Sequence, residues 1–316
     1  MEDAPAGTVK APMVSFTCNI CGSENEIEHF ASEPATCACG SNVRLRALIH
    51  LLSIELFGRS LPLPAFPRMK AIRGIGMSDK DCYNGLLAEK FDYTNTFYDR
   101  EPRLDFTEPH PELAGQYDFI LSADVLEHIA PPVERALAEA HRMLKPHGFL
   151  GITVYCHPAD RLREHFPTLN EFRIVPLGEG SVLINRRQDG TLEIRDDLIF
   201  HGGSGATLEM REYGASALRA QLLAAGFHGV DFLTGNVPEI GVLFDHDTSQ
   251  PLIARNHDFT FDHCAGHQMV DAWQSAEVRA REEKERADLL TERIRLAAGS
   301  RWLRLGRALG IGPKFE

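Results

Sequence analysis

Four cysteines near the start of the chain have the type and spacing of metal ligands. Cys18 and Cys21 are separated by two residues, and Cys37 and Cys39 follow further along the chain. Thiolates spaced in this way can bind one tetrahedral Zn²⁺ from two tight turns. Zinc is favoured over disulfides in a chain expected to be cytoplasmic. Unrelated reduced thiols are the alternative, since the second pair has one intervening residue where two are usual. Four thiolates leave no open coordination position, so we expect a structural zinc.

Composition limits the classes of protein to consider. With 316 residues, 43% of them hydrophobic and 25% charged, we expect one large domain with appendages. No long apolar run and no signal-peptide pattern occur, so the sequence predicts a cytoplasmic protein without a transmembrane segment. The formal net charge of −12 does not favour nucleic acid as a partner, because phosphate contacts need clustered Lys and Arg.

A stretch in the middle of the chain has the pattern of a strand, a loop, a helix and a second strand. It runs from Tyr117 to Thr153 and contains Glu127-His128 and, before the second strand, a Leu-Lys-Pro-His-Gly sequence. Such a unit builds a parallel α/β sheet. The stretch resembles class I S-adenosylmethionine-dependent methyltransferases, with His147 where the family usually has glycine. The resemblance implies a Rossmann-like, seven-stranded methyltransferase sheet with S-adenosylmethionine as the cofactor.

The same resemblance implies which residues bind the cofactor. A first strand leads into Gly74-Ile-Gly76, where glycines let the backbone approach a nucleoside; Ile72 and Ser78 stand where the family has an acid and a third glycine. Asp99 matches the acid that accepts hydrogen bonds from the ribose, and Asp105 the one that contacts the adenine. The alternatives are a simple tight turn and ordinary loop carboxylates. The implied cofactor-binding residues are Gly74, Gly76, Asp99, Asp105, Ala123 and Asp124.

A long excursion after the fifth strand replaces the family's usual short connection. In it, Ser181–Asn185 and Thr191–Arg195 flank an Asp-Gly turn, which predicts a β-hairpin. A glycine-rich loop follows, and its sequence from Phe200 to Arg211 is nearly identical to a stretch in methyltransferases associated with sugar and glycan biosynthesis. The resemblance implies that this loop forms the substrate side of the site.

Methyl transfer to a hydroxyl or a protonated amine needs a general base, and histidine commonly supplies one near neutral pH. His128, just past the fourth strand, and His201, which opens the glycine-rich loop, are the candidate catalytic residues. The alternative for His128 is a residue that only caps or orients its loop. We expect His141, His157 and His165 to be surface or loop residues.

The C-terminal segment differs in composition from the rest of the chain. Residues 268–296 are dense in Glu, Arg and Ala with alternating charge, which predicts a long solvated helix, with a coiled-coil dimer as the alternative. Ser300–Gly310 is short, basic and amphipathic, which suits a membrane surface or a protein partner. Similar tails end some glycan-pathway glycosyltransferases, so docking to glycan-assembly proteins is favoured over peripheral membrane contact.

The predicted organisation combines these segments. It consists of a disordered tail (1–14), a zinc-ribbon-like segment with a helix over Val43–Phe57 (15–59), a proline-rich linker (60–68), a methyltransferase domain (69–250) that contains the hairpin insertion and substrate loop (157–205), and a C-terminal helix with a basic amphipathic tail (251–316).

The sequence therefore predicts a methyltransferase that transfers a methyl group in line to an oxygen or nitrogen of a saccharide or another small molecule. One alternative is a catalytically inactive methyltransferase-like scaffold, which the altered glycine loop supports. A second is a protein or nucleic-acid methyltransferase that grips its substrate with the ribbon. The negative net charge speaks against nucleic acid, although not against a basic protein.

Overall fold

The computed structural model describes residues 14–27, 36–201, 207–244, 250–257 and 263–310. The predicted N-terminal tail and residues 202–206 of the predicted substrate loop lie outside these ranges, apart from residue 14. The chain divides into two compact units, Met1–Phe261 and Asp262–Glu316. Each unit is described by itself below.

The first unit contains the strands and most of the helices of the described residues. Its strands are β1 (Val14–Thr17), β2 (Glu24–Ile27), β3 (Arg73–Met77), β4 (Asp92–Thr96), β5 (Tyr117–Ala123), β6 (Leu144–Thr153), β7 (Arg163–Glu164), β8 (Glu171–Leu177), β9 (Gly180–Arg186), β10 (Leu192–Arg195), β11 (Phe200–His201), β12 (Thr207–Leu208), β13 (Arg211–Glu212), β14 (Gly229–Phe232) and β15 (Leu252–Arg255). Its helices are α1 (Val43–Phe57), α2 (Asp81–Lys90), α3 (Glu134–Met143) and α4 (Ala215–Ala224), with 3₁₀ turns η1 (Leu63–Ala65), η2 (Pro111–Leu113), η3 (Leu126–His128) and η4 (Pro238–Ile240).

A mixed sheet forms the centre of the first unit. In the described residues it has six strands in the order β14-β15-β6-β5-β3-β4. The strands β4, β3, β5 and β6 are parallel, whereas β15 is antiparallel to both of its neighbours. The carboxyl ends of β3, β4 and β5 therefore meet at one edge, where ligands bind in open α/β sheets.

Two predictions about the sheet strands are wrong. The third strand expected at 103–107 is not formed, because Phe97 and Arg103 make only an isolated bridge, and the described ranges contain six strands of the sheet where seven were expected. The last strand is β15 at Leu252–Arg255, whereas the expected segment near 240 forms η4 and a local turn. The sheet thus extends beyond residue 250, the predicted end of the domain.

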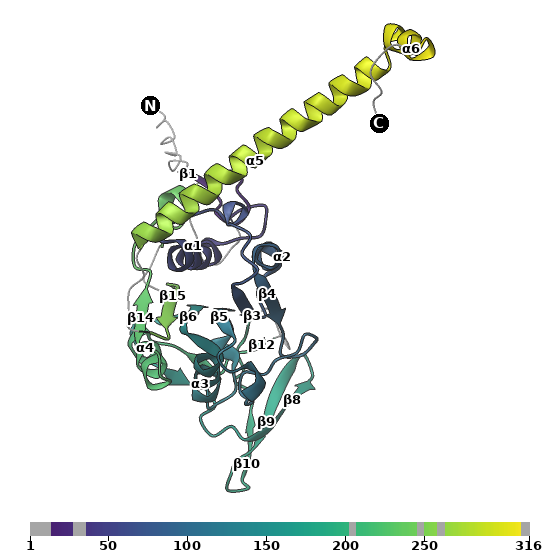
Figure 1. Ribbon diagram of the computed structural model, residues 1–316. Coiled ribbons are helices and arrows are strands. Elements are labelled where there is room, and N and C mark those ends of the chain that lie inside the picture. The colour runs from purple at the N-terminus through teal and green to yellow at the C-terminus, as the bar shows by residue number, and fades with distance from the viewer. Residues whose placement is uncertain (1–13, 28–35, 202–206, 245–249, 258–262, 311–316) are drawn as a thin grey trace, which may run out of the picture. The chain divides into compact units, whose positions relative to one another are not determined.

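Helices cover both faces of the sheet, as Figure 1 shows, with α1 and α2 on one side and α3 and α4 on the other. Alternation along β5 explains this arrangement, because Phe119 and Ile120 point to opposite faces. Phe119 joins a run of aromatic rings with Phe91, Tyr93 and Phe149 on the α1 and α2 side. Ile120 belongs to the apolar cluster that includes residues of α3 and α4.

The cysteine-bearing segment packs directly on the sheet unit. The helix over Val43–Phe57 is confirmed, and it begins at the N-cap Asn42, whose side chain accepts a hydrogen bond from the backbone N–H of Leu45. The proline-rich stretch that we expected to be a linker is packed instead, since Leu63 and Phe66 are fully buried. The Phe66 ring contacts Phe57 of α1.

The excursion after β6 contains the predicted hairpin, β9 paired with β10. Strand β8, which the sequence analysis missed, adds a third strand beside β9. Along β8 most side chains are exposed and lack a buried alternating face, so hydrophobic periodicity gave no signal for it.

The second unit consists of helix α5 (His263–Ala298), over the segment where a long helix was expected, followed by α6 (Arg301–Ala308). Charged residues alternate along α5, and Arg295 pairs with Glu292. Within the described ranges, none of the helices combines the length and the apolar character that a membrane span requires.

Candidate functional site

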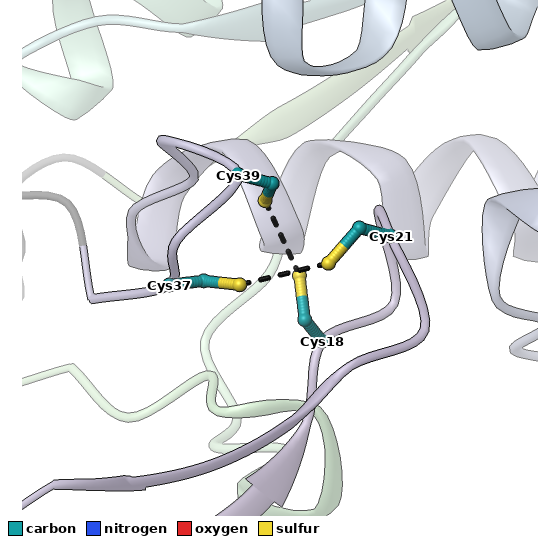
Figure 2. Close-up of side chains that lie close together, drawn as sticks. All are labelled: Cys18, Cys21, Cys37 and Cys39. Atoms are coloured by element: carbon teal, nitrogen blue, oxygen red, sulfur yellow. Dashed lines mark hydrogen bonds between the residues drawn. The ribbon is translucent and has the colours of Figure 1, made fainter.

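The four predicted zinc ligands lie together, as Figure 2 shows. The sulfur atoms of Cys18 and Cys39 are 3.8 Å apart and those of Cys21 and Cys37 3.6 Å apart, and all four lie within 4.8 Å of one another. Sulfur atoms about 3.8 Å apart are expected around a tetrahedral zinc with Zn–S bonds of about 2.3 Å. The donor set therefore fits zinc, and the thiols are free rather than disulfide-bonded.

A buried arginine beside the cysteine cluster supports a negatively charged centre. Arg46 is fully buried and lies over the Phe16 ring. It donates hydrogen bonds to Thr36 Oγ1 and to the backbone oxygens of Ser41 and Gly241, and within the described residues no carboxylate pairs with it. A buried cation needs a counter-charge. Zinc bound by four thiolates carries a net charge of about −2 and would supply it.

A polar cavity of about 500 Å³, the first pocket, opens between the cysteine segment and the sheet. Asp124 lines it from the end of β5, and Lys80 and Asp81 line it from the start of α2. The opposite wall comes from the cysteine segment and α1, including Cys39, Gly40, Asn42 and Arg44. Arg44 Nη1 lies 3.1 Å from Asp124 Oδ1, so an ion pair joins the two walls.

A second pocket of about 290 Å³ shares Lys80 and Asp81 with the first. Asp99 and Arg100 line it after β4, and Ser78 lines it after β3. Ser78 has a φ of 58°, in the left-handed region that favours glycine. The turn after β3 thus lies at the position where the resembling family has its third glycine.

The remaining residues predicted to bind cofactor do not line either pocket. Gly74 and Gly76 lie inside β3, and Ala123 is buried at the end of β5. A Cβ on Gly74 would overlap the Phe119 ring, so packing against that ring requires glycine there. The Asp105 side chain accepts hydrogen bonds from the N–H and the hydroxyl of Thr107 and forms a local turn.

A buried carboxyl group, that of Asp79, lies beside the second pocket just after β3. Asp79, which lines the second pocket, accepts hydrogen bonds from the hydroxyls of Tyr83 and Tyr93. Burial raises the pKa of Asp79 to about 6, although these two hydrogen bonds oppose the increase. A Cβ on Gly76 would collide with the Asp79 carboxylate and the Tyr93 hydroxyl, which explains the glycine at this position.

The two candidate catalytic histidines lie side by side, although they are far apart in the sequence. The ring centroids of His128 and His201 are 4.8 Å apart with the planes nearly perpendicular. His128 Nδ1 lies 2.9 Å from the carbonyl oxygen of Leu208, and His201 Nε2 lies 2.6 Å from Glu209 Oε2. Burial lowers the pKa of His128, which favours the neutral ring.

Sequence reasoning missed two partners of this histidine pair. Glu209 also accepts from His165 Nε2 at 2.8 Å, so His165, which lies in a loop as expected, is a partly buried member of the network. Arg211 is buried, pairs with Glu164, and donates to the carbonyl oxygens of Leu126 and Ile129. Arg211 thereby fixes the turn that carries His128. The signal for it in the sequence was its position in the 200–211 stretch, which was expected to form the substrate side of the site.

Glu127 completes the group of polar residues around the histidines. Its side chain is buried, and its Oε2 atom has no hydrogen-bond partner. Burial raises the pKa of Glu127 to about 8, with a further contribution from the Asp124 carboxylate. Glu127 and His128 belong to η3, which follows Asp124 at the carboxyl end of β5, so both lie near the edge of the sheet where the first pocket opens.

Residues 99–152 match the family model described as a methyltransferase domain. This span begins at Asp99 in the second pocket and runs through β5 and η3 into β6. The match supports a methyltransferase, and together with the mixed sheet it fits a Rossmann-like methyltransferase fold. No curated protein matches the chain significantly.

Several solved structures are similar to this chain at low identity. The citrinin polyketide synthase CMeT domain has a TM-score of 0.42 and 16% identity over 71% of this chain, which spans 55% of that protein. A 1,6-didemethyltoxoflavin-N1-methyltransferase from Burkholderia thailandensis has a TM-score of 0.36 and 17% identity over 67% of this chain and 79% of its own. A sugar N-methyltransferase from Streptoalloteichus has a TM-score of 0.36 and 13% identity over 66% and 85%. Such similarity carries no conclusion about substrate.

Proposed function

We propose that the protein is an S-adenosylmethionine-dependent methyltransferase with a structural zinc in its cysteine segment. One observation carries the proposal: a pair of polar pockets lies at the carboxyl ends of neighbouring parallel strands, and part of its lining falls in the segment that matches the methyltransferase model. This edge is the ligand-binding edge of open α/β sheets.

The lining of the two pockets fits the chemistry of the cofactor. Lys80, Arg100 and the N-terminus of α2 can hold a carboxylate such as that of the methionine part. Asp99 and Asp124 can accept hydrogen bonds from ribose hydroxyls and an ammonium group. The pockets have volumes of about 500 and 290 Å³, which suit a ligand of this size.

We assign the acceptor side to the histidine pair. Bound S-adenosylmethionine supplies an electrophilic methyl group on a positively charged sulfur. The protein has to hold the acceptor in line with that methyl group and to remove a proton where the acceptor is a hydroxyl. His128 donates from Nδ1 to the Leu208 carbonyl, which leaves its Nε2 lone pair free to accept a proton.

The finer features of the function remain our own predictions. We propose an oxygen or nitrogen of a saccharide or another small molecule as the acceptor, because the 200–211 stretch resembles that of sugar-associated methyltransferases and contributes His201 and Glu209. A glycan-assembly partner for the C-terminal tail and a cytoplasmic location are predictions from sequence alone.

Calorimetric titration of the zinc-loaded protein with S-adenosylmethionine and S-adenosylhomocysteine tests the proposal. We expect micromolar binding by the wild type and at least about tenfold weaker binding by Asp99→Asn, because a hydrogen bond to a charged group contributes about 1.5–3 kcal/mol. Asp92→Asn is the matched control. Asp92 begins the same strand at its opposite end and lines neither pocket, so its substitution leaves affinity unchanged.

The outcome also separates the alternatives. A folded wild type that binds neither ligand would exclude the enzyme and favour the inactive scaffold. Cofactor binding with methylation of a basic protein, and of none of a panel of saccharides, would favour the protein methyltransferase instead.

A further inference from the structure

We propose that Glu127, His128 and His201 form a binding site for a divalent transition-metal ion, separate from the cysteine cluster. One potential ligand atom from each of these residues lies within 4.8 Å of the other two. Two imidazoles and one carboxylate are a recurrent donor set for zinc and for other first-row transition metals such as iron. We call these residues the metal triad.

The hydrogen bonds of both imidazoles are those of metal ligands. A histidine that binds a metal through one nitrogen usually donates the N–H of the other to a carbonyl or a carboxylate. His128 Nδ1 contacts the Leu208 carbonyl oxygen at 2.9 Å, and His201 Nε2 contacts Glu209 Oε2 at 2.6 Å. These contacts leave Nε2 of His128 and Nδ1 of His201 with available lone pairs.

The Glu127 side chain of the metal triad has one oxygen without a hydrogen-bond partner. Glu127 is buried, and its Oε2 atom makes no hydrogen bond. A buried carboxyl oxygen without a partner is costly whether the group is protonated or ionised, and coordination of a cation would remove that cost. The backbone that carries this side chain is held in place, because the Glu127 carbonyl accepts from Met210 N at 2.7 Å and Arg211 donates to the carbonyl of Leu126.

The outer partners of the metal triad are themselves held in place. Glu209 uses Oε1 for His165 and Oε2 for His201, so both oxygens are occupied and the residue orients His201 rather than binding the ion. The orientation of the two imidazoles depends on the packing of the chain segments around residues 128, 165 and 208. Arg211 holds these segments together through its hydrogen bonds to Glu164, Leu126 and Ile129.

Three protein ligands leave coordination positions open. His201 is 43% exposed, so a small molecule can approach the ion from solvent. Oxygen atoms of an acceptor could occupy these positions, and the cation would favour the ionised form of a bound hydroxyl. With the ion bound, Nε2 of His128 is a ligand, so the ion takes the place of this nitrogen in promoting ionisation of the acceptor. This role rests on the proposed function, whereas metal binding itself does not.

Metal titration tests the site without cofactor or acceptor. The full-length protein is loaded with zinc and treated with a chelator until one zinc per chain remains, in the tighter four-thiolate cluster. It is then titrated with Co²⁺, with metal content measured by mass spectrometry and coordination by visible spectroscopy. We expect one zinc and one additional cobalt per chain, and the cobalt spectrum should have the weak bands of nitrogen and oxygen ligands without thiolate charge-transfer bands.

Matched variants identify the ligands. Glu127→Gln and His201→Ala should each weaken cobalt binding at least about 100-fold, and Glu209→Gln about 10–100-fold through loss of ligand orientation. His147→Gln is the control, because His147 is an exposed histidine that pairs with Asp118 away from the metal triad. His201→Ala removes a partly exposed side chain, so this variant should fold even if Glu127→Gln does not. Circular dichroism verifies its folding.

Two results would overturn the proposal. One is a zinc-loaded wild type that takes up no additional cobalt. The other is a His201→Ala variant that retains the wild-type cobalt affinity and spectrum. Because S-adenosylhomocysteine binding is measured separately, failure of the metal site and failure of the methyltransferase proposal are distinct results.

Discussion

Arg44 and Asp124 form an ion pair of 3.1 Å that joins the first helix to the end of the fifth strand. Arg44 lies just after the cysteine segment, and Asp124 has a φ of 58°, a conformation that Asp and Asn tolerate better than most residues. Both residues line the first pocket. The cysteine segment therefore forms part of the candidate cofactor site and is not merely an appendage to it.

Asp124→Asn should weaken S-adenosylhomocysteine binding by at least about tenfold, because it removes the charge that pairs with Arg44 and faces the pocket. Asn tolerates the same backbone conformation, so the thermal unfolding temperature should change little. Asp189→Asn provides a comparison on the hairpin turn, where binding should be unaffected. Equal affinities of wild type and Asp124→Asn in calorimetry would remove Asp124 from the cofactor site.

Removal of zinc should weaken cofactor binding as well as folding. Cys39 and Gly40 line the first pocket, so loss of the metal that orders them would also disturb the pocket wall. Cys39→Ser should lose bound zinc, melt at lower temperature and bind S-adenosylhomocysteine less tightly. Cys156→Ser leaves the four ligands intact and should retain zinc; zinc content is measured by mass spectrometry. Unchanged zinc content in Cys39→Ser would contradict the assignment.

Arg46→Met should lower zinc affinity by about tenfold, since the guanidinium balances the negative thiolate centre in a buried environment. Competition with a colorimetric chelator measures this affinity. Arg68→Met, which removes an exposed partner of Glu89, is the control and should behave as wild type. A variant that keeps wild-type zinc affinity would show that Arg46 serves only its neutral hydrogen-bond acceptors.

Gly74→Ala should destabilise the protein by about 1–3 kcal/mol, because the new methyl group would overlap Phe119. That ring is stacked between Tyr93 and Phe149 and has little room to move. Gly85→Ala is the opposite case: nothing lies within 4 Å of a Cβ in the interior of α2, so helix propensity should stabilise it by up to about 1 kcal/mol. Denaturant unfolding measures both, and equal effects would refute this packing explanation.

Asp79 should make stability fall as pH rises from about 4 to about 6. Its pKa is raised from 3.8 to about 6 on folding, so its stabilising contribution is fully present below the lower value and is lost as pH rises through the higher one. The expected loss is on the order of 3 kcal/mol, at about 1.4 kcal/mol per pKa unit. Asp79→Asn should lack this pH dependence.

Denaturant unfolding of wild type and Asp79→Asn across this pH range isolates the effect, with the exposed Asp92→Asn as the control. Parallel pH profiles for wild type and Asp79→Asn would show that the Asp79 carboxyl group titrates normally in the folded protein.

Local patterns predicted several elements correctly. The helical spacing of Leu45, Leu48 and Leu52 indicates α1, and the structure shows that the helix begins at the N-cap Asn42. The Asp-Gly turn flanked by β-branched residues indicated the β9–β10 hairpin. In each case neighbouring residues contain the signal, because the helix repeat, the cap and the two-strand turn are local interactions.

The errors arose where distant contacts decide the structure. Leu104 and Phe106 are buried, yet the segment expected as a strand forms a turn around Asp105. The Gly74 and Gly76 pattern suggested a cofactor loop, whereas both positions lie within β3 and are glycine because Phe119, Asp79 and Tyr93 approach from elsewhere in the chain.

Closely spaced residues define the parallel α/β unit from Tyr117 to Thr153, the first helix and the four candidate zinc ligands, so the sequence alone is enough to predict them. In contrast, long-range packing brings Arg44 to Asp124 and gathers His128, His201 and Glu209 in one site. Arg44 and Asp124 are 80 positions apart in the sequence, and His128 and His201 are 73 positions apart. Nothing in the local pattern of either segment specifies such a contact, which depends on how the sheet and its loops pack.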